Sequence, residues 1–166
     1  MSRLDSFINR MSAQRDILNH VRHQLALPDG PVLEIGLGNG RTYSHLREIF
    51  PDRRIVAFDR QLGAHKTQLP DPQDFIIGEI HQTAQEFVGK NAALVHADIG
   101  TGYPEKDAIT LTWLPQMVSG MLATDGIAVS GLPLEHTLLE ELPGLESVQK
   151  GRYFFYRKKS EGQPTS

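Results

Sequence analysis

Apolar side chains recur at helical spacing over the first 26 residues, at Leu4, Phe7, Ile8, Met11, Leu18, Val21 and Leu25. A polar gap at Gln14 and Arg15 interrupts this stripe. Ser2 is suited to cap the start of the helix, and residues 28–30 end it with proline and glycine. An apolar stripe usually faces the core, so we expect this helix to pack on the rest of the fold. The alternative is a lid over an active site.

Short apolar runs then alternate with segments of helical pattern. The runs typical of buried strands are 31–35, 55–58, 75–77, 93–96 and 127–129. The helical segments are 41–50, 81–88 and 105–122, and Pro115 should kink the last of these or start a new helix. We expect a turn at Asp125-Gly126 and a helix over 134–142. Two strands, 145–148 and 152–157, should form a terminal hairpin joined through Lys150-Gly151.

Alternation of strands and helices predicts an α/β fold whose mostly parallel sheet is covered by helices on both faces. Ligands in such sheets bind beyond the carboxyl ends of the strands, near the switch in strand order. The length of 166 residues suits one domain over residues 1–159, with a helical segment at 1–27 and an α/β core at 31–159. The tail at 160–166 has the composition of a disordered segment.

Composition narrows the function classes. The formal net charge of −3 argues against a nucleic-acid binder that relies on bulk positive charge, although a local basic patch stays open. The chain has no cysteine, which excludes disulfides, thiolate metal sites and cysteine nucleophiles. The N-terminus lacks the apolar core of a signal peptide, and no apolar run reaches the roughly 20 residues that span a bilayer. We therefore expect a cytoplasmic protein without a membrane partner.

Three alternating glycines, Gly36, Gly38 and Gly40, stand between the first predicted strand and the helix that follows it. Glycine admits backbone angles that side chains forbid and lets a ligand approach the main chain closely. The dinucleotide fingerprint G-x-G-x-x-G requires its third glycine where this chain has Arg41, so that pattern fails. The next predicted strand ends in Asp59, nineteen residues after Gly40, where a carboxylate can bind both ribose hydroxyls.

This glycine turn, preceded by Glu34, resembles motif I of class I S-adenosylmethionine (SAM) methyltransferases. Asp59, the segment Gly78-Glu79-Ile80 and Asp98 match the acids and neighbours that follow later strands in that family, although Glu79 stands where aspartate is commoner. The resemblance covers residues 31–158 and implies a Rossmann-like fold with a seven-stranded sheet, a C-terminal antiparallel hairpin and SAM as cofactor. It implies these cofactor-binding residues: Glu34, Gly36, Leu37, Gly38, Asn39, Gly40, Thr42, Asp59, Arg60, Glu79, Ile80 and Asp98.

Methyl transfer mainly requires that the acceptor, the methyl carbon and the sulfur be held in line. A base is needed only when the acceptor must lose a proton, and Asp98 is the catalytic candidate for that role. The alternative is that Asp98 orients the cofactor or the following loop. His96 and Asp98 share a strand face, but one histidine and one aspartate fall short of a metal site, so we expect none. The aromatic residues 153–156 are interpreted as a buried closing strand rather than as a base-stacking surface.

The sequence therefore predicts a SAM-dependent methyltransferase that acts on a small-molecule acceptor. One alternative is a non-catalytic SAM-binding module, since acceptor-site residues are poorly marked. A nucleotide-dependent oxidoreductase is disfavoured by the glycine spacing. A homo-oligomer, formed through exposed parts of the first helix, is compatible with the sequence.

Overall fold

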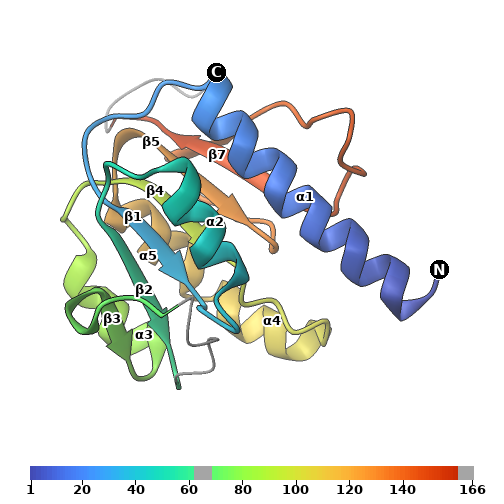
Figure 1. Cartoon of the computed structure of the whole chain (residues 1–166), viewed down its shortest axis with the longest axis horizontal. Helices are drawn as coiled ribbons and strands as arrows, with labels where there is room; N and C mark the ends of the chain where they lie inside the picture. The colour runs from blue at the N-terminus through green and yellow to red at the C-terminus, as the bar shows by residue number, and fades with distance from the viewer. Residues whose placement is uncertain (62–68, 161–166) are drawn as a thin grey trace.

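The computed structural model describes residues 1–61 and 69–160, so the predicted disordered tail lies outside the described residues apart from Ser160. One seven-stranded sheet runs in the order β3-β2-β1-β4-β5-β7-β6 (Figure 1). Its strands are β1 (Val32–Ile35), β2 (Ile55–Asp59), β3 (Phe75–Ile77), β4 (Ala92–Ala97), β5 (Leu122–Ser130), β6 (Leu139–Glu141) and β7 (Phe154–Lys158). Strands β1 to β5 pair in parallel, and β7 is antiparallel to both β5 and β6. The predicted fold class is confirmed.

Helices cover both faces of the sheet and bury two apolar clusters against it. One face carries α1 (Arg3–Gln24) and α2 (Arg41–Ile49), and the other carries α3 (Ile80–Thr83), the 3-10 turn η3 (Ala84–Phe87) and α5 (Leu114–Met121). The remaining elements are α4 (Pro104–Leu111) and the 3-10 turn η2 (Pro72–Asp74). Strands β1 and β4 are buried along their whole length, as expected for central strands whose two faces are both covered. Among the described residues, no helix is long and apolar enough to cross a membrane.

Helix α1 has two parts with different surroundings. Ser2 caps it through a capping box with Asp5, whose backbone N–H donates to the Ser2 hydroxyl at 3.0 Å. Its second half packs on the sheet through buried apolar residues, namely Ala13, Ile17, Leu18 and Val21. Its first half extends beyond the sheet (Figure 1), and Leu4 there is 66% exposed. The apolar stripe read from the sequence is therefore core only over its second half.

Two mid-chain predictions met different outcomes. Pro115 does start a new helix, because α4 ends at Leu111 and α5 begins at Leu114. The turn expected at Asp125-Gly126 is instead an irregularity inside β5. Asp125 has a φ of +71°, and the pairing of β5 with β4 shifts register before it resumes at Ile127. A local change of backbone angle is absorbed here as a bulge because the chain pairs with β4 on both sides of it.

The C-terminal predictions need correction. The helix expected over 134–142 is wrong, because residues 139–141 form the edge strand β6. The partner of β7 is this strand and not residues 145–148, which lie in the long loop between β6 and β7. Without β6, the backbone N–H and C=O groups along one edge of β7 would be unpaired. Hydrogen bonding to this edge therefore outweighs the weak helical pattern of residues 134–142. The antiparallel hairpin is present, but with a different first strand.

The loop before β6 is fastened by one buried hydrogen bond, from the Leu134 backbone N–H to the Tyr156 hydroxyl at 2.9 Å. Burial raises the pKa of Tyr156 to about 12. Tyr156→Phe would leave that N–H buried without a partner and should lower the free energy of unfolding by about 1–3 kcal/mol. Urea unfolding tests this, with Tyr103→Phe as the control because Tyr103 is 58% exposed. Equal effects of the two substitutions would contradict the assignment.

Candidate functional site

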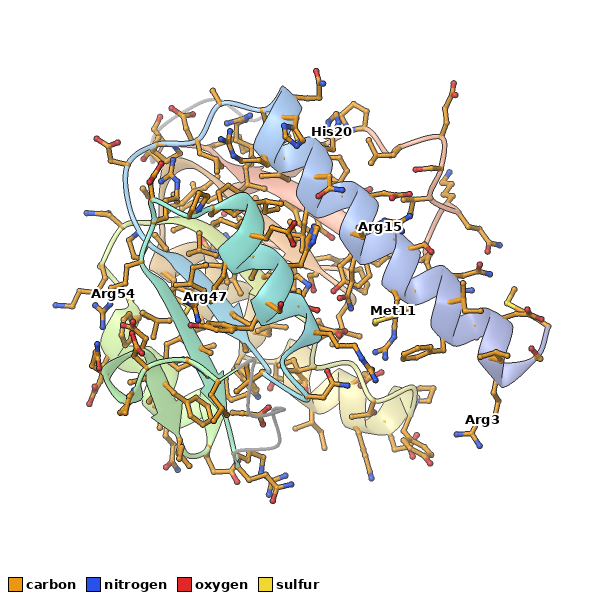
Figure 2. The ribbon with its side chains drawn as sticks, in the orientation of Figure 1. Arg3, Met11, Arg15, His20, Arg47 and Arg54 are labelled. Atoms are coloured by element: carbon orange, nitrogen blue, oxygen red, sulfur yellow. The ribbon has the colours of Figure 1, made fainter. Side chains whose placement is uncertain are left out.

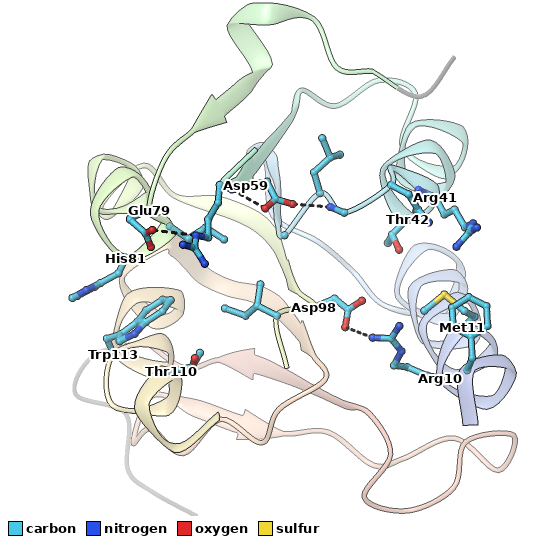
Figure 3. Close-up of a pocket in the computed structure, with 18 residues that line it drawn as sticks. Arg10, Met11, Arg41, Thr42, Asp59, Glu79, His81, Asp98, Thr110 and Trp113 are labelled. Carbon is cyan, nitrogen blue, oxygen red and sulfur yellow. Dashed lines mark hydrogen bonds and ion pairs between the residues drawn. The ribbon is translucent and has the colours of Figure 1, made fainter. Parts of the chain in front are cut away.

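A cavity of about 680 Å³ lies at the carboxyl ends of β1, β2 and β4 (Figure 3). Parallel pairing of Ile35 with both Phe58 and Ala97 brings the segments that follow these three strands to one edge of the sheet. Most of the residues that the sequence predicted for cofactor binding line this cavity: Gly36, Leu37, Gly38, Asn39, Thr42, Asp59, Arg60, Glu79, Ile80 and Asp98. Glu34 and Gly40 do not line it. The volume is within the usual range for small-molecule sites.

The glycines of the turn serve different purposes. A side chain on Gly36 would place its Cβ 2.8 Å from the Ile99 side chain, so this glycine allows the turn to pack against the segment after β4. Gly38 has a φ of +55°, and no atom lies within 4 Å of the place where a Cβ would be. Gly40 is the left-handed N-cap of α2. The turn therefore leaves open space above Gly38 for a ligand that approaches the main chain.

Asp59 is fixed in place by the turn that it faces. One carboxylate oxygen accepts the Gly38 backbone N–H at 2.8 Å, and the other accepts the Arg60 N–H at 2.7 Å. Each oxygen keeps lone-pair capacity for a further donor, such as a ribose hydroxyl. The nearby ion pair between Arg60 and Glu79, at 3.1 Å, joins two exposed side chains and adds little stability.

The end of the cavity near β3 is apolar and aromatic. Ile80 lies there, 9% exposed, beside the stacked rings of His81 and Trp113, whose centroids are 5.0 Å apart at 20°. Sequence reasoning did not identify His81 or Trp113 as site residues. Ile80 and the Trp113 ring give this end of the cavity apolar contacts that a planar base can use.

Helix α1 supplies a wall of the cavity that the sequence reading missed. Phe7, Arg10 and Met11 line it, whereas Arg3 extends from the free end of the helix (Figure 2). The nearby Gln14 is only 3% exposed. Its amide donates to one Asp98 carboxylate oxygen at 2.7 Å and accepts from the Thr42 hydroxyl at 2.9 Å. The available signal was the polar gap in the apolar stripe, since a glutamine on a core-facing side needs polar partners.

Glu34 lies inside the protein instead of in the cavity. Its carboxylate contacts His96 Nδ1 at 2.7 Å, and His96 Nε2 contacts the Tyr153 hydroxyl at 2.6 Å. Gln14 acts to lower the pKa of Tyr153 and donates to Asp98, so polar side chains follow one another from Glu34 to the carboxylate of Asp98. Both ring nitrogens of His96 are used within this chain. The other oxygen of Glu34 is buried and has no hydrogen-bond partner among the residues that the structure describes.

The charges of this buried chain are coupled. Burial raises the pKa of Glu34, against the opposing effect of His96. Burial acts to lower the pKa of His96, but the Glu34 carboxylate outweighs it and the pKa is raised. Burial also holds the pKa of Tyr153 well above its ordinary value. In the folded state the pair therefore retains protons that the unfolded chain would release.

This coupling predicts a pH dependence of stability. The pKa of His96 is 6.5 in the unfolded chain and higher in the folded protein. Its contribution to the free energy of unfolding is therefore complete below pH 6.5 and is lost as pH rises through the folded pKa. The pKa of Glu34 is also raised, from 4.5, so this group likewise lowers the free energy of unfolding as pH rises above 4.5. In Glu34→Gln, burial is the largest remaining influence and lowers the pKa of His96, so its contribution grows as pH rises toward 6.5.

We therefore expect the free energy of unfolding of the wild type, relative to Glu34→Gln, to fall as pH rises from about 5 to 8. Urea unfolding across this range measures the difference. His45 and His136, whose pKa values burial lowers, occur in both proteins and cancel. A difference that is flat or rises with pH would contradict the account.

Comparison with known proteins gives the family. A family model for S-adenosyl-L-methionine methyltransferases matches residues 1–158. The crystal structure of an S-adenosyl-L-methionine methyl transferase from Silicibacter pomeroyi DSS-3 is 39% identical, with a TM-score of 0.86 over 95% of this chain and 99% of that one. The antibiotic-resistance methyltransferase Kmr shares the fold at 12% identity and a TM-score of 0.55, over 88% of this chain and 93% of its own.

No functionally curated protein matches the chain. The family model nonetheless spans nearly all of it, and the match to the Silicibacter protein extends over almost the full length of both. These findings exclude the oxidoreductase alternative. This chain belongs to the S-adenosyl-L-methionine methyltransferase family and is a methyltransferase that uses SAM as its cofactor.

Proposed function

We propose that the chain transfers the methyl group of SAM in line to a small-molecule acceptor, and that the cavity at the ends of β1, β2 and β4 holds the cofactor. The observation that carries this proposal is the open space at Gly38 directly beside the oriented carboxylate of Asp59. A glycine that leaves the main chain open and a fixed acid are what a nucleoside-bearing ligand requires at adjoining positions.

We assign the residues of the cavity to the ribose, adenine and methionine parts of the cofactor in turn. Asp59 would bind the ribose hydroxyls, with Arg60 at the border between ribose and adenine. Glu79 and Ile80 would meet the adenine, beside the flat surface of His81 and Trp113. The methionine part would lie along the turn and against its flanking residues, namely Gly36, Leu37, Gly38, Asn39, Gly40 and Thr42. Glu34 would support this region from inside, through His96.

When bound, SAM supplies a methyl group that its sulfonium already activates for transfer. The protein then has to hold the acceptor in line and exclude water, and such positioning can supply roughly 7–11 kcal/mol. Asp98 is occupied by two donors, the Gln14 amide and the Arg10 guanidinium. This favours the interpretation in which Asp98 orients the cofactor. A general-base role stays the alternative for acceptors that must lose a proton.

Two features support a small acceptor over a nucleic acid. Phe7 and Met11 of α1 give the cavity apolar walls, and the net charge of the chain is −3. We also propose that residues 1–159 act as one domain in the cytoplasm. The exposed first half of α1, with Leu4 and Ile8, is compatible with a homo-oligomer.

The cofactor assignment predicts what an alanine side chain in the glycine turn does to SAM binding. Gly38→Ala should weaken SAM binding by more than about tenfold, or about 1.4 kcal/mol, because its Cβ would enter the space assigned to the cofactor. Isothermal titration calorimetry measures the affinity.

The matched control is Gly89→Ala. Gly89 also has a positive φ, +85°, and open space at its Cβ, but it does not line the cavity. The two substitutions carry similar backbone strain, so only Gly38→Ala should lose affinity. Equal affinities of the two variants would show that the turn does not contact SAM.

The acceptor class is tested with SAM that carries a labelled methyl group. Cell extract is separated into small molecules, nucleic acid and protein, and each fraction is incubated with the enzyme. We expect label in the small-molecule fraction with the wild type and less label with Gly38→Ala at the same SAM concentration. Label in the nucleic-acid or protein fraction would overturn the small-acceptor proposal, as would the absence of label from the small-molecule fraction.

A further inference from the structure

Asp98 and Arg10 place opposite charges side by side in the wall of the cavity. The Arg10 Nη1 lies 3.5 Å from Asp98 Oδ1, and both side chains line the same space. Figure 3 shows them next to each other, on the α1 side of the cavity. Asp98 follows β4, and Arg10 lies in the first half of α1. This juxtaposition joins a segment far along the chain to the N-terminal helix.

The two side chains are held by different means. Gln14 fixes Asp98 through its other oxygen at 2.7 Å, so Oδ1 is the oxygen left toward Arg10. Arg10 is looser: its side chain is 41% exposed, against 18% for Asp98, and its guanidinium lies over the Phe7 ring at 5.9 Å. At 3.5 Å the ion pair is longer than a strong charged hydrogen bond of about 2.7–2.9 Å. Arg10 is therefore available to a better anionic partner.

An adjacent carboxylate and guanidinium form the charge complement of an amino acid zwitterion. The ammonium group of such a ligand matches Asp98, and its carboxylate matches Arg10, whose fork can hold both oxygens. The methionine part of SAM carries this pair of charges at its end. Asp98 adjoins the turn, since a Cβ on Gly36 would lie 3.1 Å from the Asp98 backbone oxygen.

We propose that Asp98 and Arg10 together bind the amino acid end of the cofactor, with Asp98 on the ammonium group and Arg10 on the carboxylate. The inference rests on the proposed cofactor site and adds that α1 completes it. Gln14 is a positioning residue, because it orients Asp98 and ties it to Thr42. Arg41 lines the same cavity and lies over the same Phe7 ring at 5.8 Å, yet it forms no ion pair with any acid in residues 1–61 and 69–160.

Decarboxylated SAM distinguishes the role of Arg10 from that of Asp98. It keeps the adenosine, the sulfonium and the ammonium group of SAM and lacks only the carboxylate. Calorimetry compares SAM with this analogue on the wild type and on Arg10→Ala, Arg41→Ala and Asp98→Asn. The wild type should bind SAM about 10- to 100-fold more tightly than the analogue, the range for a charged hydrogen bond. Arg10→Ala should weaken the binding of SAM by that factor and change the affinity for the analogue by less than about twofold. This variant should therefore no longer prefer SAM to the analogue.

Arg41→Ala is the matched control and should keep the wild-type preference. Asp98→Asn should weaken both ligands by similar factors, because both retain the ammonium group. Thermal melting checks that each variant is folded. An Arg10→Ala variant that keeps the preference for SAM, or loses affinity equally for both ligands, would overturn this inference alone. A folded wild type that binds neither ligand would overturn the proposed cofactor site as well.

Discussion

Parallel pairing of β1 with both β2 and β4 is the constraint on which the site depends. Once three neighbouring strands point the same way, whatever follows them in the sequence meets at one edge of the sheet. The glycine turn, Asp59 and Asp98 are brought together in this way, although more than sixty residues separate the first from the last. The apolar strands that enforce the pairing thus also determine the chemistry, since a slip of one residue would turn these side chains to the opposite face.

A second constraint is that polar groups buried between α1 and the sheet need partners. Glu34, His96, Tyr153 and Gln14 meet this need mainly through one another, and their chain ends at Asp98 in the cavity. Hydrogen bonds between buried polar groups fix the side chains that form them, although one buried oxygen of Glu34 has no partner among the described residues. The hydrogen bonds of Gln14 to Asp98 and Thr42 therefore fix α1 beside the proposed cofactor site. Polar side chains extend in this way from the interior, at Glu34 and His96, to Gln14 and to Asp98 in the wall of the cavity.

Local signals in the sequence predicted the strands, the glycine turn and the strand-end acids, because each depends on a few adjacent residues. The α1 wall could not be predicted in the same way, since the role of Arg10 depends on Asp98, far along the chain. The same reason explains the error over 134–142, where pairing with β7 decided the structure. Glu34 was identified by its place in the motif, but its burial against His96 required the register of β1 with β4.

We propose that this cavity holds the cofactor along the turn and across the strand ends. The decisive measurement is a crystal structure of the complex with S-adenosylhomocysteine, the demethylated product. We expect the ribose hydroxyls on the Asp59 carboxylate, the adenine against Ile80 and Trp113, and the sulfur near Asp98. A product molecule bound elsewhere, or bound in this cavity with its ribose away from Asp59, would contradict this proposal.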